Sequence, residues 1–178
     1  MKTKEIELKL LFKNKGLIIK KLMPDIKFVE KVKVLDNYYG KKEFSIRDKN
    51  DLVRIRIINN DTELTYKSRK RNKGRIIKKS ELTIKIPLNS VKLMEKILIN
   101  LGLKAISEHR SEKEYWRFKG AEIVFSKFTK PANLSFMEIE ADSEIKIKEI
   151  FNRIYEYVLP VKENIFSEFD KANKKNRK

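Results

Sequence analysis

Near its start the chain carries a stretch in which charged and apolar residues alternate: Glu5-Ile6-Glu7-Leu8-Lys9. Successive side chains of a β-strand point to opposite faces, so Glu5, Glu7 and Lys9 share one face and the two apolar residues share the other. An edge strand whose polar face lies in water has the same pattern. The alternation therefore predicts a strand and leaves the surroundings of its charged face open.

A second stretch of the same kind lies near the other end of the chain, at Met137-Glu138-Ile139-Glu140. It again places two carboxylates on one face of a strand and apolar residues on the other. Two such strands can bring four carboxylates together if they become neighbours in a sheet. Carboxylate oxygens are the ligands that hard divalent cations prefer, so the two stretches together predict a site for Mg²⁺ or Mn²⁺.

Two consecutive strands in the first half of the chain carry cations on their polar faces. Over residues 52–58, Arg54 and Arg56 alternate with apolar residues, and after the turn at 59–61 the next strand presents Lys67. If these faces lie in solvent, the charges have no special role. If the faces point into the protein, only a polyanion makes such a lining tolerable.

The composition limits the classes of protein to which the chain can belong. With 178 residues, of which 40% are apolar and 38% charged, it is long enough for a domain with a real core. The absence of cysteine excludes disulfides, thiolate metal ligands and a cysteine nucleophile, and the single histidine, His109, excludes a histidine-rich zinc site. We find no run of 18 apolar residues and no signal peptide, so we expect a cytoplasmic protein without a membrane span.

The formal net charge of +18 indicates an anionic partner or a strongly positive surface. The most basic stretch, residues 67–79, has the pattern of a hairpin with Gly74 at its tip, and nucleic acid is one possible partner for it. No aromatic residue interrupts 68–79 to stack on bases, so a hairpin that grips an anionic small molecule is favoured over nucleic acid. The sequence leaves a homodimer open.

Amphipathic helices are predicted between the strands. The first covers residues 90–101, with Ser90 as its N-cap and Gly102 as its C-cap, and the second covers 144–159. Their apolar stripes are typical of helices that pack on the outside of a sheet.

The chain contains no repeat, low-complexity segment or linker that would divide it. We therefore expect one domain over residues 1–170, with roughly eight strands and flanking helices. A basic tail at 171–178 follows it and is expected to be frayed.

The order of these motifs resembles that of the CYTH superfamily, also called triphosphate tunnel metalloenzymes, which includes class IV adenylyl cyclases, thiamine triphosphatases and inorganic triphosphatases. The resemblance extends from about residue 3 to about residue 170. It rests on Glu5-x-Glu7-x-Lys9 at the N-terminus, followed by Leu52-Val53-Arg54-Ile55-Arg56, Leu64-Thr65-Tyr66-Lys67, Arg110 and Glu138-Ile139-Glu140. It implies an α+β fold built on a closed antiparallel eight-stranded β-barrel, whose polar face lines a triphosphate tunnel and whose apolar face packs against helices.

The resemblance also implies roles for individual residues. Acidic side chains would hold Mg²⁺ or Mn²⁺, and basic side chains would hold the phosphates of ATP, thiamine triphosphate or tripolyphosphate. Lys9, Glu7 and Glu138 would be catalytic, and Glu81 is a loose match to an acidic position of the family. The metal ligands would be Glu5, Glu7, Glu138 and Glu140, and the substrate-binding residues Lys9, Arg54, Arg56, Lys67, Lys85 and Arg110.

The reaction expected from the resemblance is metal-dependent hydrolysis of a triphosphate. If the ribose 3′-OH of ATP attacks in place of water, the same tunnel acts as a class IV adenylyl cyclase and releases cyclic AMP and pyrophosphate. Hydrolysis is favoured because no sequence element here must bind adenine. A third alternative is a module that binds a nucleotide or polyphosphate without turnover.

Two positions depart from the family pattern. Ser126 stands where the family commonly has an aspartate, and Glu108 stands where a basic residue often precedes the family's arginine by two positions. The missing carboxylate at Ser126 removes a candidate metal ligand or base. This departure favours one metal over two and is the feature that supports the binding module.

Overall fold

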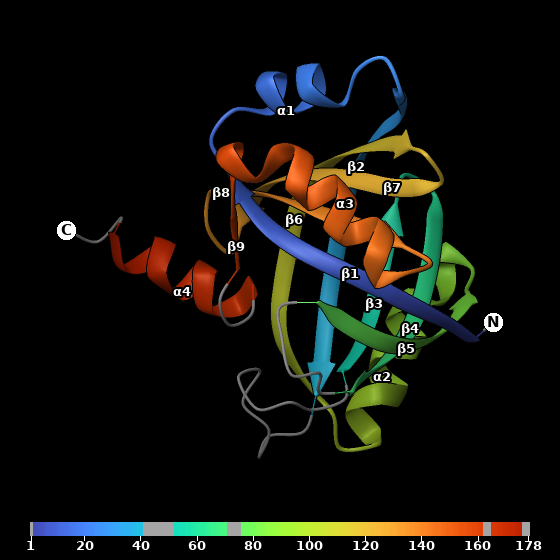
Figure 1. Cartoon of the computed structure of the whole chain (residues 1–178). Coiled ribbons are helices and arrows are strands. Elements are labelled where there is room, and N and C mark those ends of the chain that lie inside the picture. Colours follow the sequence, from blue (N-terminus) through green and yellow to red (C-terminus); the bar gives the residue numbers. More distant parts are fainter. Residues whose placement is uncertain (1, 41–51, 71–75, 162–164, 176–178) are drawn as a thin grey trace.

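The computed structural model describes residues 2–40, 52–70, 76–161 and 165–175. They form an antiparallel β-sheet flanked by helices, which confirms the expected α+β class (Figure 1). The strands are β1 (Lys2–Phe12), β2 (Ile26–Gly40), β3 (Leu52–Ile58), β4 (Asp61–Lys70), β5 (Ile77–Lys85), β6 (Lys104–Phe118), β7 (Ala121–Lys130), β8 (Leu134–Ala141) and β9 (Val158–Pro160). The helices are α1 (Lys15–Leu22), α2 (Val91–Asn100), α3 (Glu144–Ile154) and α4 (Ile165–Lys175), with short 3-10 turns η1 (Leu88–Ser90) and η2 (Tyr155–Tyr157).

The strands hydrogen-bond in the order β5-β4-β3-β2-β6-β7-β8-β1-β9, and β5 also pairs with β1. The prediction of a closed eight-stranded barrel is therefore confirmed only in part: the sheet is antiparallel, but it has nine strands rather than eight, and β9 extends it beyond β1. The ninth strand begins within the segment 144–159, which the sequence predicted to be helical throughout. The β1–β5 pairing curls the sheet and turns one of its faces inward.

One face of the curled sheet carries the polar residues of the alternating strands. β1 lies beside β8 with Glu7 opposite Glu140 and Lys9 opposite Glu138. The two alternating stretches, 5–9 and 137–140, are thus neighbours in the sheet, and their register sets charged residues opposite charged residues. We call the side of the sheet that carries these four residues the inner face, and the opposite side the outer face.

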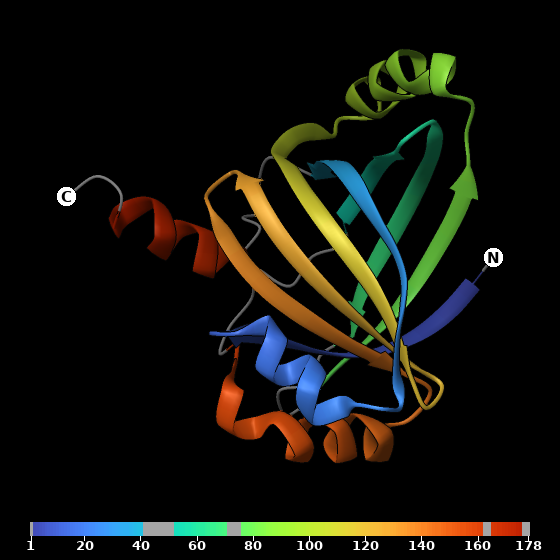
Figure 2. The ribbon, with the colours of Figure 1, turned by 90° about the horizontal axis from the view of Figure 1, so that it is seen from above.

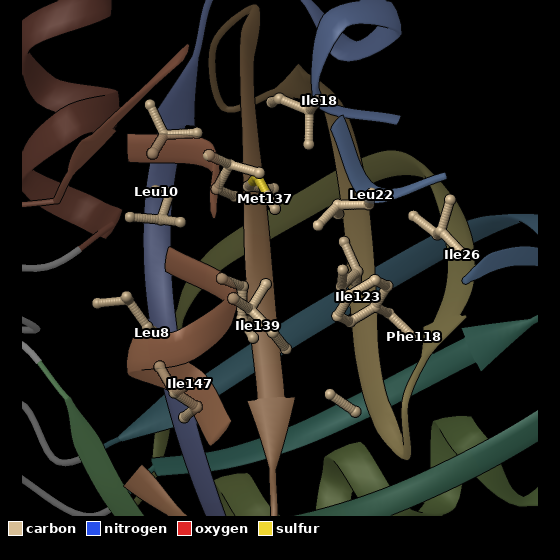
Figure 3. Close-up of a cluster of buried hydrophobic side chains, with 14 of the residues drawn as sticks. Leu8, Leu10, Ile18, Leu22, Ile26, Phe118, Ile123, Met137, Ile139 and Ile147 are labelled. Carbon is tan, nitrogen blue, oxygen red and sulfur yellow. The ribbon is translucent and has the colours of Figure 1, made fainter. Parts of the chain in front are cut away.

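The outer face of β1, β7 and β8 carries the main hydrophobic core. Leu10, Ile123 and Ile139, one from each of these strands, are completely buried, and Leu22 of α1 and Ile150 of α3 pack against the same cluster (Figure 3). Figure 2 shows α1 and α3 together at the bottom of the view and α2 at the top, with the curled sheet between them. The apolar halves of the alternating strands therefore point away from the charged inner face.

Helix α2 covers a second part of the outer face, over β2 and β3. Its Leu98 packs against Tyr39 and Ile55. The helix is followed by Gly102 in a left-handed conformation, with φ of 85°, as predicted for its C-terminal end. Ser90 does not cap α2 through its side chain, because it ends the η1 turn with a helical backbone and its hydroxyl makes no capping hydrogen bond.

Helix α4 packs at one end of the inner face. Phe169 is 2% exposed, and its ring lies 5.1 Å from that of Phe128 and 4.9 Å from that of His109. Phe136 belongs to the same hydrophobic cluster. The chain therefore uses aromatic residues to cover the sheet at this end.

Two predicted segments extend beyond the described residues. The basic hairpin at 67–79 corresponds to the facing ends of β4 and β5, and 71–75 lie outside the described residues. In the tail, α4 continues to Lys175, so residue 171 does not end the regular structure, and 176–178 again lie outside. None of the described helices combines the length and apolar character needed to cross a membrane.

Candidate functional site

Two arginines and an aspartate form one part of the site, on the inner face of β2 and β3. Arg56 donates two hydrogen bonds to Asp36, from Nε to Oδ1 at 2.7 Å and from Nη2 to Oδ2 at 2.9 Å. Nε of Arg54 lies 3.8 Å from the same Oδ1. The register places Arg56 directly opposite Asp36, which the sequence analysis did not assign to the site.

These three charged side chains are shielded from water. Asp36 is 2% exposed and Arg54 is 6% exposed. Burial by itself raises the pKa of Asp36, but the attraction of Arg56 and Arg54 outweighs burial and holds that pKa well below its ordinary value. Burial lowers the pKa of Arg56, and the ion pair with Asp36 more than reverses this effect. One carboxylate thus balances the charge of two buried guanidinium groups.

Lys9 lies among the carboxylates of β1 and β8. Its ammonium group donates a hydrogen bond to Glu138 and lies 3.6 Å from Oε1 of Glu7. It also lies 5.6 Å from the centre of the Phe136 ring. The structure therefore brings together Glu7, Lys9 and Glu138, the three residues predicted to be catalytic.

Lys113 of β6 is a site residue that the sequence analysis did not select. Its side chain is buried, and its Nζ lies 4.0 Å from Oε2 of Glu138. Burial lowers the pKa of Lys113 well below its ordinary value, and repulsion by Arg56 lowers it further, against the attraction of Asp36. Strand alternation could have indicated this position, because Lys113 and His109 are separated by an even number of residues and therefore lie on the same face of the strand.

Strands β4 and β5 contribute a further pair. Lys67 forms a hydrogen-bonded ion pair with Glu81, its direct cross-strand neighbour. The hydroxyl groups of Thr65 and Thr83 lie 3.2 Å apart, and Nη2 of Arg54 donates to Oγ1 of Thr65 at 3.4 Å. The predicted Lys67 and the loosely matched Glu81 therefore both lie on the inner face, on the same strands as Thr65 and Thr83.

Arg110 does not join this group. Its side chain is 62% exposed, and its Nε donates to Oε1 of Glu108 at 2.8 Å. The register between β6 and β7 shifts between Arg110 and Ser111, and Arg110 points away from the inner face. Arg110 is therefore not part of the inner-face cluster, and Lys113 is the basic residue of β6 that is.

The remaining two predicted residues are Lys85 and Glu5. Lys85 lies at the end of β5 with 75% of its side chain exposed, 3.8 Å from Oδ1 of Asp61. Its strand parity is that of the inner face, but its position at the strand end leaves it in solvent. The backbone of Glu5 pairs with that of Lys79, and the side chain of Glu5 lies outside what the structure describes.

Ser126 lies directly opposite Lys113 across the β6–β7 pair. Its hydroxyl is buried and forms no hydrogen bond with any residue in the described ranges. Glu122, earlier on the same strand face, is opposite Glu140, and burial together with the charge of Glu140 raises the pKa of Glu122. A neutral hydroxyl thus faces Lys113 where the family pattern places a carboxylate.

The carboxylates of the inner face have the chemistry of a site for a hard divalent cation. Glu7, Glu138 and Glu140 lie on the adjacent strands β1 and β8 and are the described residues that would hold Mg²⁺ or Mn²⁺. Within the described parts of the chain, no three acidic or histidine side chains are already close enough together to bind a metal ion. The carboxylate oxygens are therefore suitable ligands for the cation. In this structure Lys9 forms ion pairs with two of these carboxylates, Glu138 and Glu7.

His109 lies where the inner face meets α4, among the rings of Tyr38, Phe128 and Phe169. It is 3% exposed. Burial lowers its pKa to about 4, against the attraction of Asp36. His109 is therefore neutral at physiological pH and belongs to the aromatic packing at this end.

We expect acid to destabilise the protein through His109. The unfolded chain, in which this histidine has its ordinary pKa of 6.5, binds a proton more readily than the folded chain. The stability that His109 contributes is thus complete above pH 6.5 and is lost as the pH falls towards 4. His109→Phe keeps an aromatic ring and should remove this part of the acid sensitivity in urea denaturation. Titration of this single histidine by NMR with a midpoint near 6.5 would contradict the prediction.

Similarity to known proteins agrees with this geometry at the level of the fold. The PH1012 protein from Pyrococcus horikoshii OT3 has a TM-score of 0.68 and 20% identity, over 88% of this chain and 95% of that one. A putative adenylyl cyclase from Hippeastrum, described as revealing a dominant triphosphatase activity, has a TM-score of 0.69 and 14% identity, over 94% and 95%. A putative adenylate cyclase from Bacillus halodurans has a TM-score of 0.61 and 16% identity, over 92% and 97%.

The sequence itself identifies the family. No curated protein sequence matches the chain significantly. A sequence model of the CYTH domain, however, matches residues 3–163, which is nearly the whole chain. This range includes β2 to β9, all of β1 except Lys2, and all the inner-face residues described above. The chain therefore belongs to the CYTH domain family.

Proposed function

We propose that this chain binds a triphosphate on its inner face and hydrolyses it with the help of a divalent cation. The observation that carries the proposal is the convergence of Lys9, Arg54, Arg56 and Lys113 from three different strands. Breaking a phosphoanhydride requires charge neutralisation and alignment more than covalent participation of the protein. A triphosphate spreads its negative charge along its length and so matches cations that are spread over several strands.

Binding would exchange the partners of the charged groups. Lys9 donates to Glu138, and a phosphate oxygen is an equally suitable acceptor for that lysine. The exchange would leave Glu138, together with Glu7 and Glu140, able to hold Mg²⁺ or Mn²⁺. When bound, the cation supplies the Lewis acid that polarises a phosphoryl oxygen and activates water.

The arginines act on the substrate through their fixed orientation. Asp36 holds Arg56 by two hydrogen bonds, so the guanidinium does not have to be ordered when substrate binds. Thr65 holds Arg54 in the same way, by a hydrogen bond of 3.4 Å. Such preorganised donors stabilise developing charge more effectively than groups that must reorganise.

A binding module without turnover is the second candidate, and Ser126 favours it. The buried hydroxyl opposite Lys113 supplies no negative charge to a cation or to an attacking water. The class IV adenylyl cyclase reaction remains the alternative within the enzyme class, and it differs only in the attacking group. The Hippeastrum protein joins both names in its description, although its likeness to this chain, at 14% identity, concerns the fold alone.

One assay separates these candidates. The purified chain is incubated with tripolyphosphate, ATP or thiamine triphosphate in Mg²⁺ or Mn²⁺, and the products are separated by chromatography. Metal-dependent release of orthophosphate is the expected result. Cyclic AMP with pyrophosphate would identify a cyclase. Binding of tripolyphosphate in calorimetry without any product would replace the enzyme by the binding module.

Glu138→Gln tests the metal assignment directly. The variant neutralises one of the carboxylates, so we expect its affinity for Mn²⁺ to fall roughly tenfold, about 1.4 kcal/mol. Electron paramagnetic resonance in the presence of tripolyphosphate measures the bound Mn²⁺. Glu149→Gln removes an exposed carboxylate of α3 and is the matched control, expected to leave Mn²⁺ affinity unchanged. Equal Mn²⁺ affinity in wild type and Glu138→Gln would exclude Glu138 as a ligand.

A further inference from the structure

Ser126 of β7 is a buried hydroxyl of the inner face. Ile123 and Phe125, on the same strand, belong to the hydrophobic core of the outer face. Because side chains alternate along a strand, Ser126 points to the inner face. It is 1% exposed, and its hydroxyl forms no hydrogen bond with any residue in the described parts of the chain. A buried hydroxyl without a protein partner is costly to the fold, so its place inside the candidate site indicates that a ligand supplies the partner.

Two ammonium groups lie near this hydroxyl. Ser126 is directly opposite Lys113 of β6 on one side and Phe136 of β8 on the other. Directly opposed residues of an antiparallel pair have Cβ atoms about 4.5–5.5 Å apart, so Ser126 and Lys113 are neighbours on the inner face. The ammonium group of Lys9 lies 5.6 Å from the centre of the Phe136 ring. The hydroxyl is therefore in a positively charged part of the site.

The charge of Lys113 is only partly balanced. Among the described residues, only Glu138 places a carboxylate oxygen within 4.0 Å of Nζ of Lys113, and Glu138 also accepts a hydrogen bond from Lys9. The positive charges of Arg56 and Arg54 act on Lys113 as well. One glutamate is thus shared by two lysines, and an additional anion beside Lys113 would be attracted.

A phosphate group provides acceptors for both side chains. The serine hydroxyl can donate one hydrogen bond and the lysine ammonium group three. Phosphate has several oxygens, so it can accept from Ser126 and Lys113 together, and charge-assisted hydrogen bonds of this kind are roughly twice as strong as neutral ones. A carboxylate at position 126 would instead pair with Lys113 and repel the phosphate.

We propose that Ser126 is a substrate-binding residue, which donates a hydrogen bond to a phosphate group held by Lys113, and that this phosphate is bound without a divalent cation. The inference rests on the proposed binding of a triphosphate to the inner face and assigns one of its phosphate groups to β6 and β7. The carboxylates that would hold Mg²⁺ or Mn²⁺, Glu7, Glu138 and Glu140, lie on β1 and β8. Binding of the triphosphate should therefore tolerate removal of the metal, whereas hydrolysis should not.

Calorimetric titration with tripolyphosphate in EDTA tests this role. We expect the wild type to bind and Ser126→Ala to bind on the order of tenfold to hundredfold more weakly, as for the loss of a hydrogen bond to a charged group. Ser126→Thr keeps the hydroxyl and is suited to a strand, so it should bind like the wild type. Ser126→Asp should bind more weakly than Ser126→Ala in EDTA, and Mn²⁺ should restore more of its affinity, because a cation can bridge the carboxylate and the phosphate.

Ser135→Asp is the matched control. Ser135 of β8 lies directly opposite Lys127, so it repeats the cross-strand serine–lysine pair, but its parity is that of the outer face. Its affinity for tripolyphosphate in EDTA should equal that of the wild type. Urea denaturation shows whether each variant is folded. If the buried aspartate prevents folding, the comparison of Ser126→Ala with Ser126→Thr still tests the hydroxyl.

The same titrations contain the results that would overturn the role of Ser126. Equal affinity in the wild type and Ser126→Ala would exclude the hydroxyl as a phosphate ligand, and equal losses in Ser126→Ala and Ser126→Thr would reduce it to a packing residue. A wild type that binds tripolyphosphate only with Mg²⁺ or Mn²⁺ would refute the cation-independent phosphate while leaving the proposed hydrolysis intact. Binding in EDTA that depends on Ser126, without turnover in either metal, would refute the hydrolysis and support the role of Ser126. Absence of binding under all these conditions would refute both.

Discussion

Asp36→Asn is expected to lower the free energy of unfolding by about 3–5 kcal/mol, the effect typical of removing one partner of a buried ion pair. Asp36 accepts hydrogen bonds of 2.7 and 2.9 Å from Arg56 and lies 3.8 Å from Arg54, and it is 2% exposed. Lys113 is held in the same electrostatic field. Without the carboxylate, these cations repel one another in a site that water screens poorly. Urea denaturation of both proteins measures the difference.

Asp142→Asn is the matched control for this prediction. Asp142 is paired with Lys146 at 3.1 Å but is 74% exposed, and solvent screens such pairs strongly. Its urea midpoint should stay near that of the wild type. Added tripolyphosphate should restore part of the stability lost in Asp36→Asn, since a bound polyanion replaces the missing negative charge. Wild-type stability in Asp36→Asn would show that the cations of β2 and β3 are not held together by this carboxylate.

Lys113→Met is expected to lower kcat/KM for the triphosphate by on the order of 10²–10³, the effect of removing one preorganised electrostatic group. Lys113 lies 4.0 Å from Glu138, and the charges of Arg56, Asp36 and Lys9 act on it, so it lies in the electrostatic field of both halves of the site. Methionine has a similar length and suits a buried position. The substitution also removes the repulsion of Lys113 by Arg56, and Lys9 still pairs with Glu138, so the fold should stay intact, which thermal unfolding can verify.

Arg110→Met provides the control on the same strand. Arg110 is also basic, but it points outward, is 62% exposed and pairs with Glu108. We expect its kcat/KM to equal that of the wild type. Equal losses in the two variants, or no loss in Lys113→Met, would contradict the site. If the wild type binds without turnover, tripolyphosphate affinity from calorimetry replaces kcat/KM in the same comparison.

The sequence predicted the charged strand faces well because alternation is a local property. Alternation assigned Glu7 and Lys9 to the polar face of one strand and Glu138 to the polar face of another, and the structure places the three side chains together. Arg54 and Arg56 follow the same rule. A strand reverses its side chains at every residue whatever it pairs with, so the members of one face can be identified without the fold.

Residues whose role depends on pairing were missed or misplaced. Asp36 acquires its role only when β2 lies beside β3 in the register that sets it opposite Arg56. Arg110 and Lys113 lie on one strand with mixed alternation, and the shift in register at Ser111 could not be located from the residues alone. In each case the hydrogen bonds of a distant strand decided which side chain belongs to the site.

The extra strand has a similar explanation. Helical periodicity continues past Ile154, so residues up to 159 were assigned to one helix. The structure ends α3 at that residue and pairs Val158–Pro160 with the end of β1. A run of three residues is too short for its periodicity to indicate a strand. The residues of β1 with which it pairs, Leu10 to Phe12, are also far from it in the chain.

Alternation and periodicity along the chain were enough to assign residues to strand faces, to locate most strands and helices approximately and to indicate the resemblance to the CYTH family. The inner position of the charged face, the number of strands and the placement of Lys113 rather than Arg110 beside Glu138 followed from the folded chain. The physical reason is the range of the interactions. Periodicity is set by the backbone of neighbouring residues, whereas burial, register and ion pairing are set by hydrogen bonds between strands that are far apart in the chain.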